Sequence, residues 1–227
     1  MRGGPASCHS HHSGRRGLTA ERRICGIDFD NTIITYDELL AKIACERGLL
    51  NSGLDQTKRK LRDRIRELPD GEIEWQRCQA LMYGSRISEA KLIEGVPRFF
   101  ELCRRHGVKV HIVSHKTEFS QFDTTGSNLR SAALEWMTAN DFFERSGLDM
   151  RREDIFFAET RQAKIDCLAG LRCTDFIDDL EETFLEPTFP QGVARILYEP
   201  RRESVPPTGV MLMKTWREIS DYFFHTH

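Results

Sequence analysis

The sequence places four aspartates in two short clusters, each directly after an apolar run of strand length. Asp28 and Asp30 follow the first run, and Asp178 and Asp179 follow a later one. A short apolar run that ends in polar residues is typical of a buried parallel strand leading into a functional loop. Ligands of open parallel sheets bind beyond the carboxyl ends of the strands, so we predict that both clusters lie at one sheet edge.

Four carboxylates at one edge would repel one another unless a cation neutralised their charge. Oxygen ligands suit a hard cation, and no cluster of His and Cys competes for zinc. Mg²⁺ is typically held by one or two carboxylates together with a substrate phosphate. The pattern therefore predicts a magnesium cofactor and phosphate chemistry, in which the metal screens the charges of nucleophile and phosphate.

Smaller polar residues follow the same strand ends. Asn31 and Thr32 come after the first aspartates, and Ser114, His115 and Lys116 follow a second apolar strand. Amide, hydroxyl and ammonium groups can donate to phosphoryl oxygens, so we expect these residues to face the substrate. For His115 and Lys116, a solvated loop is an equally open interpretation.

The rest of the chain supplies the elements that would position these residues. From residue 94 onward, apolar strands alternate with amphipathic helices, which predicts an α/β fold with a parallel sheet covered on both faces. Residues 36–93 show helical spacing and no strand signal. We expect a core domain, residues 23–35 and 94–227, with a helical insert of residues 36–93. The expected core strands are residues 24–29, 108–113, 154–157, 174–177 and 193–198.

The composition argues against some kinds of partner. The 227-residue chain has a formal net charge of −2, which gives no electrostatic reason to expect nucleic acid or membrane. No apolar run reaches the ~18 residues of a membrane span. Seven cysteines without Cys-x-x-Cys spacing indicate free thiols in a reducing cytoplasm. Residues 1–22, rich in Gly, Ser, His and Arg, are expected to be a disordered extension, with a transit peptide as the alternative.

In chain order, these residues resemble the motifs of the haloacid dehalogenase (HAD) superfamily. The stretch Asp28-Phe29-Asp30-Asn31-Thr32-Ile33 resembles the first motif, and the strand end at Ser114 resembles the second. Lys164 stands where the third motif usually falls, before the pair Asp178-Asp179, which resembles the fourth. The resemblance covers about residues 23–200 and implies a three-layer, Rossmann-like parallel sheet with a small helical cap.

The resemblance also implies a role for each matching residue. Asp28 would attack phosphorus and form an aspartyl-phosphate. Asp30 would protonate the leaving oxygen and then activate water. Ser114 would hydrogen-bond the phosphoryl oxygens. Lys164 would pair with the nucleophile, with Lys116 as the alternative lysine.

The metal ligands implied by the resemblance come from both aspartate clusters: Asp28, the main-chain carbonyl of Asp30, Asp178 and Asp179. Family members that break carbon–halogen bonds lack an acid at the position of Asp30. The presence of Asp30 therefore favours phosphate ester chemistry over dehalogenation.

The expected function is magnesium-dependent hydrolysis of a small phosphorylated metabolite. Phosphoryl transfer to a second alcohol and a catalytically silent binding module are the alternatives. The aspartates also have a purely structural interpretation, with Asp28 and Asp30 as turn residues and Asp178-Asp179 as a helix cap. The basic run of residues 58–66 in the insert either recognises a second anionic group or forms a solvated face.

Overall fold

The computed structural model describes residues 22–51, 57–123, 125–201 and 205–225. The extension expected for residues 1–22 lies outside the described residues, apart from Arg22. Within the described ranges, no helix combines the length and apolar character needed to cross a membrane.

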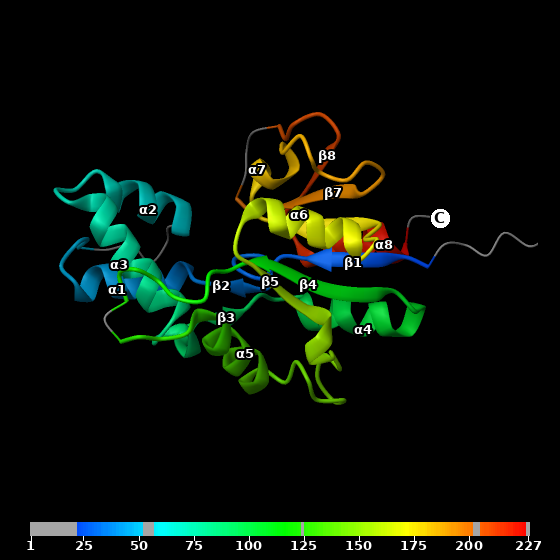
Figure 1. Ribbon diagram of the computed structural model, residues 1–227, viewed down its shortest axis with the longest axis horizontal. Coiled ribbons are helices and arrows are strands. Elements are labelled where there is room, and N and C mark those ends of the chain that lie inside the picture. The colour runs from blue at the N-terminus through cyan, green and yellow to red at the C-terminus, as the bar shows by residue number, and fades with distance from the viewer. Residues whose placement is uncertain (1–21, 52–56, 124, 202–204, 226–227) are drawn as a thin grey trace, which may run out of the picture.

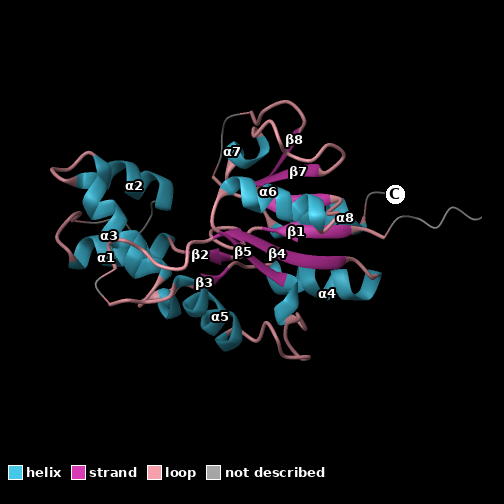
Figure 2. Ribbon diagram, viewed as in Figure 1, coloured by secondary structure: helices cyan, strands magenta, loops and turns pink. Residues whose placement is uncertain are grey.

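A six-stranded parallel sheet forms the centre of the molecule (Figures 1 and 2). The strand order is β5-β4-β1-β6-β7-β8, so the first strand of the chain lies in the middle. The chain order reverses on either side of β1, and ligands of open α/β sheets bind at such a switch point. The strands are β1 (Ile24–Ile27), β4 (Lys109–His115), β5 (Ile155–Ala158), β6 (Asp175–Asp178), β7 (Ala194–Tyr198) and β8 (Val210–Met213).

Strand side chains alternate between two apolar cores, one on each face of the sheet. In β6, Ile177 belongs to the core shared with α4 and α8, while Phe176 belongs to the core shared with α6 and α7. Figure 1 shows α6 and α4 on opposite sides of the strands. This three-layer α/β architecture confirms the expected fold class. The helices are α4 (Val96–His106), α5 (Leu129–Ala139), α6 (Arg161–Gly170), α7 (Glu181–Phe184) and α8 (Trp216–Phe224).

A helical insert leaves the core through a two-stranded stem. Strand β2 (Ile34–Thr35) pairs antiparallel with β3 (Lys91–Leu92), and three α-helices lie between them in the chain. Figure 1 shows these helices beyond the end of β1. They stand over the sheet edge at which the aspartates were expected. The helices are α1 (Asp37–Glu46), α2 (Lys58–Arg66) and α3 (Gly71–Tyr83).

Three short strands, β2, β3 and β8, differ from the expectation. The sequence showed no strand signal in residues 36–93, but β3 lies there, and β8 was not expected at all. The two residues of β3 are too few to show the alternation of buried and exposed side chains that marks a strand. The β8 sequence Val-Met-Leu-Met has only one β-branched residue. Each of these short strands is defined by the strand it pairs with, and strand propensity depends strongly on such context.

Candidate active site

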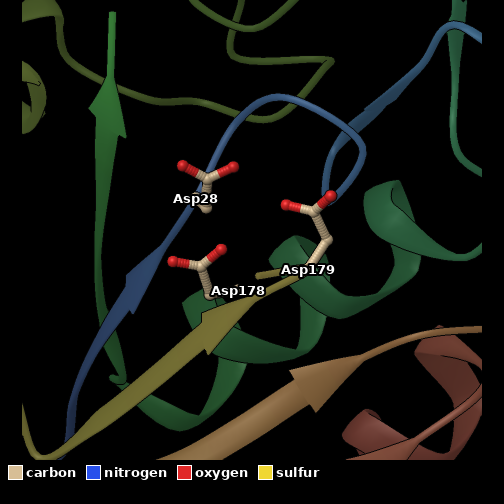
Figure 3. A group of neighbouring side chains, drawn as sticks. All are labelled: Asp28, Asp178 and Asp179. Carbon is tan, nitrogen blue, oxygen red and sulfur yellow. The ribbon is translucent and has the colours of Figure 1, made fainter. Parts of the chain in front are cut away.

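Three carboxylates gather beyond the ends of β1 and β6 (Figure 3). Asp28 follows β1, and Asp178 is the last residue of β6. Because Ile27 pairs in register with Ile177, the two aspartates lie side by side. With Asp179, each offers an oxygen, and these atoms all lie within 4.8 Å of one another. The two aspartate clusters do meet at one sheet edge.

Lys164 lies between two of these carboxylates. Its ammonium donates to Asp28 Oδ1 at 2.6 Å and to Asp178 Oδ2 at 2.7 Å, and the side chain is only 2% exposed. Helix α6 brings it there, and the Thr160 hydroxyl caps that helix by accepting from the Ala163 amide at 3.1 Å. The lysine therefore contacts the first and fourth motifs at once.

The buried charges of this group do not balance. Burial opposes the charged form of Lys164, but Asp178 and Asp28 outweigh it and raise the pKa of the ammonium. Burial also raises the pKa of Asp28, against the pull of Lys164 and with the help of Asp178 and Asp30, to about 7. The pKa of Asp179 lies well above its usual value, because of burial and then of Asp178 and Asp28. Among the described residues, Lys164 is the ammonium in direct contact with Asp28 and Asp178, while Lys58 lowers the pKa of Asp179 from a greater distance.

This group has the properties of a site for a hard divalent cation. Within the described residues, Asp28 Oδ2 and Asp179 Oδ1 have no hydrogen-bond donor, since the other oxygens contact Lys164 and Asn31 Nδ2. Unpaired carboxylate oxygens in a buried, negatively charged place are suitable ligands for Mg²⁺. The Asp30 side chain lies outside the three-carboxylate group. The residues present therefore fit the expected metal.

Asp30 faces a second lysine. Its carboxylate accepts from Lys116 Nζ, at 2.9 Å to Oδ2 and 3.2 Å to Oδ1, and from the Tyr36 hydroxyl at 2.7 Å. Burial alone would raise the pKa of Asp30, but Lys116 and Tyr36 outweigh it and lower that pKa. Both candidate lysines are therefore in the site. Lys164 contacts Asp28, and Lys116 contacts Asp30.

Three buried polar atoms at this edge lack a partner in the described structure: Asn31 Oδ1, Thr32 Oγ1 and Ser114 Oγ. Asn31 has a φ of 59°, a left-handed conformation that Asn tolerates, at the turn after Asp30. Ser114 is 1% exposed and stands near the end of β4, next to β1. Buried hydroxyls without partners are uncommon. Asn31 lines the cavity described next, whereas Thr32 and Ser114 do not.

A cavity of about 1250 Å³ opens above these residues, between the core and the insert. His115 lines it but is exposed, and its Nε2 lies 3.1 Å from the Glu159 carbonyl oxygen. Its ring therefore lies at the rim. The remaining wall includes aromatic and basic residues of the insert, among them Lys58, Trp75 and Tyr83.

Asp178 also has a structural role, but it does not cap a helix, because Leu180 is the N-cap of α7 and no side chain caps that helix. Its Oδ1 accepts from the Leu180 amide at 2.9 Å and so shapes the turn after β6. Its other oxygen still binds Lys164. One carboxylate thus fixes a turn and joins the charged group.

Known structures share this architecture, although no protein-family model and no curated protein matches the sequence. A haloacid dehalogenase-like hydrolase from Streptococcus pneumoniae is 12% identical, with 89% of this chain and 98% of that chain covered and a TM-score of 0.56. A HAD family hydrolase from Deinococcus radiodurans, with bound phosphate and sodium, is 14% identical, with 90% and 96% covered and a TM-score of 0.55. The chain has the haloacid dehalogenase fold. A HAD-hydrolase from Bacillus subtilis bound to magnesium is also similar, at 14% identity, with 89% and 99% covered and a TM-score of 0.50.

The haloacid dehalogenase fold confirms what the four short motifs indicated about architecture. At 12–14% identity, the likeness concerns the fold. The chemistry of this chain must therefore be argued from its own residues.

Two site residues did not stand out in the sequence. Tyr36 binds Asp30, and Tyr83 lies between two lysines, with its ring centroid 4.6 Å from Lys116 Nζ and 5.0 Å from Lys58 Nζ. The only local signal was the closeness of Tyr36 to Asp30 in the chain, which a helix start also explains.

Proposed function

We propose that the protein is a magnesium-dependent phosphatase that hydrolyses a small phosphomonoester through an aspartyl-phosphate on Asp28. The observation that carries this proposal is Asp28 itself. It is a buried carboxylate whose Oδ1 is held by Lys164, whose Oδ2 is unpartnered within the described residues, and which lies at one edge with Ser114. This is the arrangement that an oriented nucleophile requires.

In the first step, an Asp28 oxygen bonds to phosphorus as the bond from phosphorus to the leaving oxygen breaks. The Ser114 hydroxyl donates to a phosphoryl oxygen, and Lys164 stabilises the developing negative charge. The Lys116–Asp30 pair supplies the proton that the leaving alcohol takes, which passes from the ammonium through the carboxylate, and the second step returns a proton to the pair. The product of this step is an acyl phosphate on Asp28.

In the second step, Asp30 removes a proton from water, and the water oxygen displaces Asp28 from phosphorus. The lowered pKa of Asp30 keeps it ionised near neutral pH, which suits this base role. Asp28, Asp178 and Asp179 would hold Mg²⁺, with the Asp30 main-chain carbonyl as a further ligand. Bound there, the ion would neutralise charge on the carboxylates and the phosphate. The similar proteins with bound phosphate and bound magnesium support this assignment.

The direct test is hydrolysis of p-nitrophenyl phosphate with Mg²⁺ and then with EDTA. We expect turnover with Mg²⁺ and its loss on chelation. Absence of magnesium-dependent turnover, on this compound and on a panel of phosphorylated metabolites, would instead support a silent binding module. Addition of alcohols tests phosphoryl transfer, because a transferase would move phosphate to the alcohol at the expense of free phosphate.

The partner and compartment belong to the same proposal. The enclosed position of Asp28 beneath the insert favours a small metabolite over a folded macromolecule. The six described cysteines are all free, which suits the reducing cytoplasm.

A further inference from the structure

One face of helix α2 borders the cavity that Asp28 lines. Lys58, Arg62 and Arg66, which are spaced four residues apart and so share a helix face, line the cavity together with Arg59. Leu61 and Ile65 form the adjacent, buried stripe of the helix. The exposed Lys60 and Arg64 are not part of the cavity wall. The basic run is therefore divided between a cavity face and a solvated face.

The cations on the cavity face differ in how they are paired. Arg62 pairs with Asp63 at 2.7 Å, and Arg66 pairs with Glu72 at 2.7 Å. Lys58 and Arg59 have no carboxylate within ion-pair distance among the described residues. These two residues stand at the start of α2. Their charges are thus available to a ligand in the cavity.

Lys58 is held in place by contacts that include no direct ion pair with a described carboxylate. Its Nζ donates to the Tyr83 hydroxyl at 2.6 Å and lies 5.5 Å from the centroid of the Tyr36 ring. Its main-chain amide donates to Asp37 Oδ1 at 2.7 Å, which ties the start of α2 to α1. Burial would lower the pKa of Lys58, but Tyr83, Asp179 and Asp30 outweigh it and raise that pKa. The side chain therefore remains an ammonium.

The N–H donors of Lys58 that have no acceptor among the described residues indicate what kind of ligand it binds. A lysine ammonium has three N–H donors, and among the described residues only the Tyr83 hydroxyl accepts from one of them. A partly buried charge is costly unless an opposite charge compensates it. Because Asp28 and Lys58 line the same cavity, one small molecule can reach both.

We propose that the substrate carries a second anionic group, a carboxylate or a further phosphate, which binds Lys58 and Arg59 while its reacting phosphate lies at Asp28. This inference rests on the proposed phosphatase function. Lys58 would select a charged tail, and neutral-tailed phosphates of the same length would be poorer substrates. The insert would thus contribute specificity through charge.

The test uses a pair of substrates that differ only in that charge, namely an ω-phosphonooxy carboxylic acid and its primary amide, in a series of chain lengths. Both share one leaving-group oxygen, so the chemical step is matched. At the best chain length we expect kcat/KM for the acid to exceed that for the amide by about tenfold or more. A bisphosphate of the same chain length distinguishes the two anions, because the preferred tail gives the higher kcat/KM.

Two variants test whether Lys58 causes the preference for the acid over the amide. Lys58→Met removes the charge with little change in length, and we expect the acid-to-amide ratio to fall toward one. Lys60→Met removes a charge from the exposed side of the same helix, and we expect that ratio to stay as in the native protein. Thermal unfolding of each variant checks that the insert remains folded. An unchanged ratio in Lys58→Met would overturn the assignment.

The two proposals fail in distinguishable ways. Suppose that the native protein turns over acid, amide and bisphosphate equally, with magnesium dependence intact. This result would contradict the proposal of a second anionic group and would leave the proposed phosphatase function standing. Equal loss of acid and amide turnover in Lys58→Met would also contradict the second anionic group, because Lys58 would then serve the reaction and not the tail. If neither p-nitrophenyl phosphate nor any acid, amide or bisphosphate of the series is hydrolysed with Mg²⁺, both proposals are wrong.

Discussion

At the residue scale, the site consists of two lysine–carboxylate groups with different surroundings. Lys164 contacts Asp28 and Asp178 in a place that is almost fully enclosed. Lys116 contacts Asp30, which also accepts from a tyrosine. The first group has an excess of negative charge, whereas the second is balanced. The two aspartates of the first motif therefore have opposite pKa shifts, because burial dominates at Asp28 whereas Lys116 and Tyr36 outweigh burial at Asp30.

Replacing Asp28 by Asn tests the nucleophile. We expect hydrolysis of p-nitrophenyl phosphate to fall by about 10⁴-fold or more, because the amide cannot form the acyl phosphate. The melting temperature in EDTA should be equal or higher, since one of several mutually repelling buried carboxylates is gone. Steady-state kinetics and calorimetry provide the two measurements. Retained turnover would remove Asp28 from its assigned role.

Replacing Lys164 by Met tests the buried charge group. The change leaves Asp28 and Asp178 without their shared ammonium, and loss of one partner from a buried pair costs about 3–5 kcal/mol. Urea unfolding at neutral pH in EDTA should show a loss of that order. Lys91→Met is the matched control, because Lys91 pairs with Glu38 on the surface with both side chains more than half exposed. The control should lose less than about 1 kcal/mol, and similar losses in both variants would contradict this account.

At the element scale, the position of Asp28 depends on how closely β1 packs under α6. Gly26 lies in β1, and a Cβ there would come within 2.9 Å of both Leu168 Cδ2 and Phe176 Cδ2. Leu168 lies on α6 and Phe176 on β6. The elements that carry Lys164 and Asp178 therefore approach β1 as closely as they do because residue 26 has no side chain.

Gly26→Ala should accordingly destabilise the protein by about 1–3 kcal/mol through overpacking. Gly170→Ala is the control, because a Cβ at that α6 position meets nothing within 4 Å. It should be neutral or stabilising by up to about 1 kcal/mol, since Ala favours helix over Gly. Chemical denaturation of both variants measures the difference. Equal effects would show that the space around Gly26 is not restrictive.

At the scale of the whole molecule, the unbalanced charge should appear in how stability depends on pH. In EDTA, the pKa of Asp28 is about 7 in the folded protein, against an ordinary value of 3.8. Between these values the folded state holds a proton that the unfolded state has lost, so the contribution of this group falls as pH rises from about 4 to about 7. The pKa of Asp30 is lowered from 3.8, so its contribution changes only below that range.

Mg²⁺ should therefore raise the melting temperature more at pH 8 than at pH 5. At pH 8 the ion meets ionised carboxylates, whereas at pH 5 it must displace a proton from Asp28. Thermal unfolding with Mg²⁺ and with EDTA at both pH values measures this difference. In Asp28→Asn the pH-dependent part of the shift should shrink. A shift that is equal at both pH values in the native protein would argue against a metal at this site.

The sequence by itself determined the edge of the sheet at which the site lies. Short apolar runs that end in polar residues marked β1, β4 and β6, and parallel strands have their carboxyl ends at one edge because they all run in the same direction. Asp28, Ser114 and Asp178 could therefore be assigned to one place before any contact was known. The alternation of strands and helices fixed the fold class in the same local way.

Only the tertiary structure decided which side chains touch. Lys164 and Lys116 were both open candidates, and the rotation of α6 over β1 directs the first to Asp28 while the second reaches Asp30. The cavity position of Lys58 likewise depends on how the insert packs, because Lys58 and Asp28 line one cavity only once the insert is folded against the core. Local periodicity specifies where a strand ends, but a contact between distant residues depends on helix rotation and packing, which no short stretch of sequence encodes.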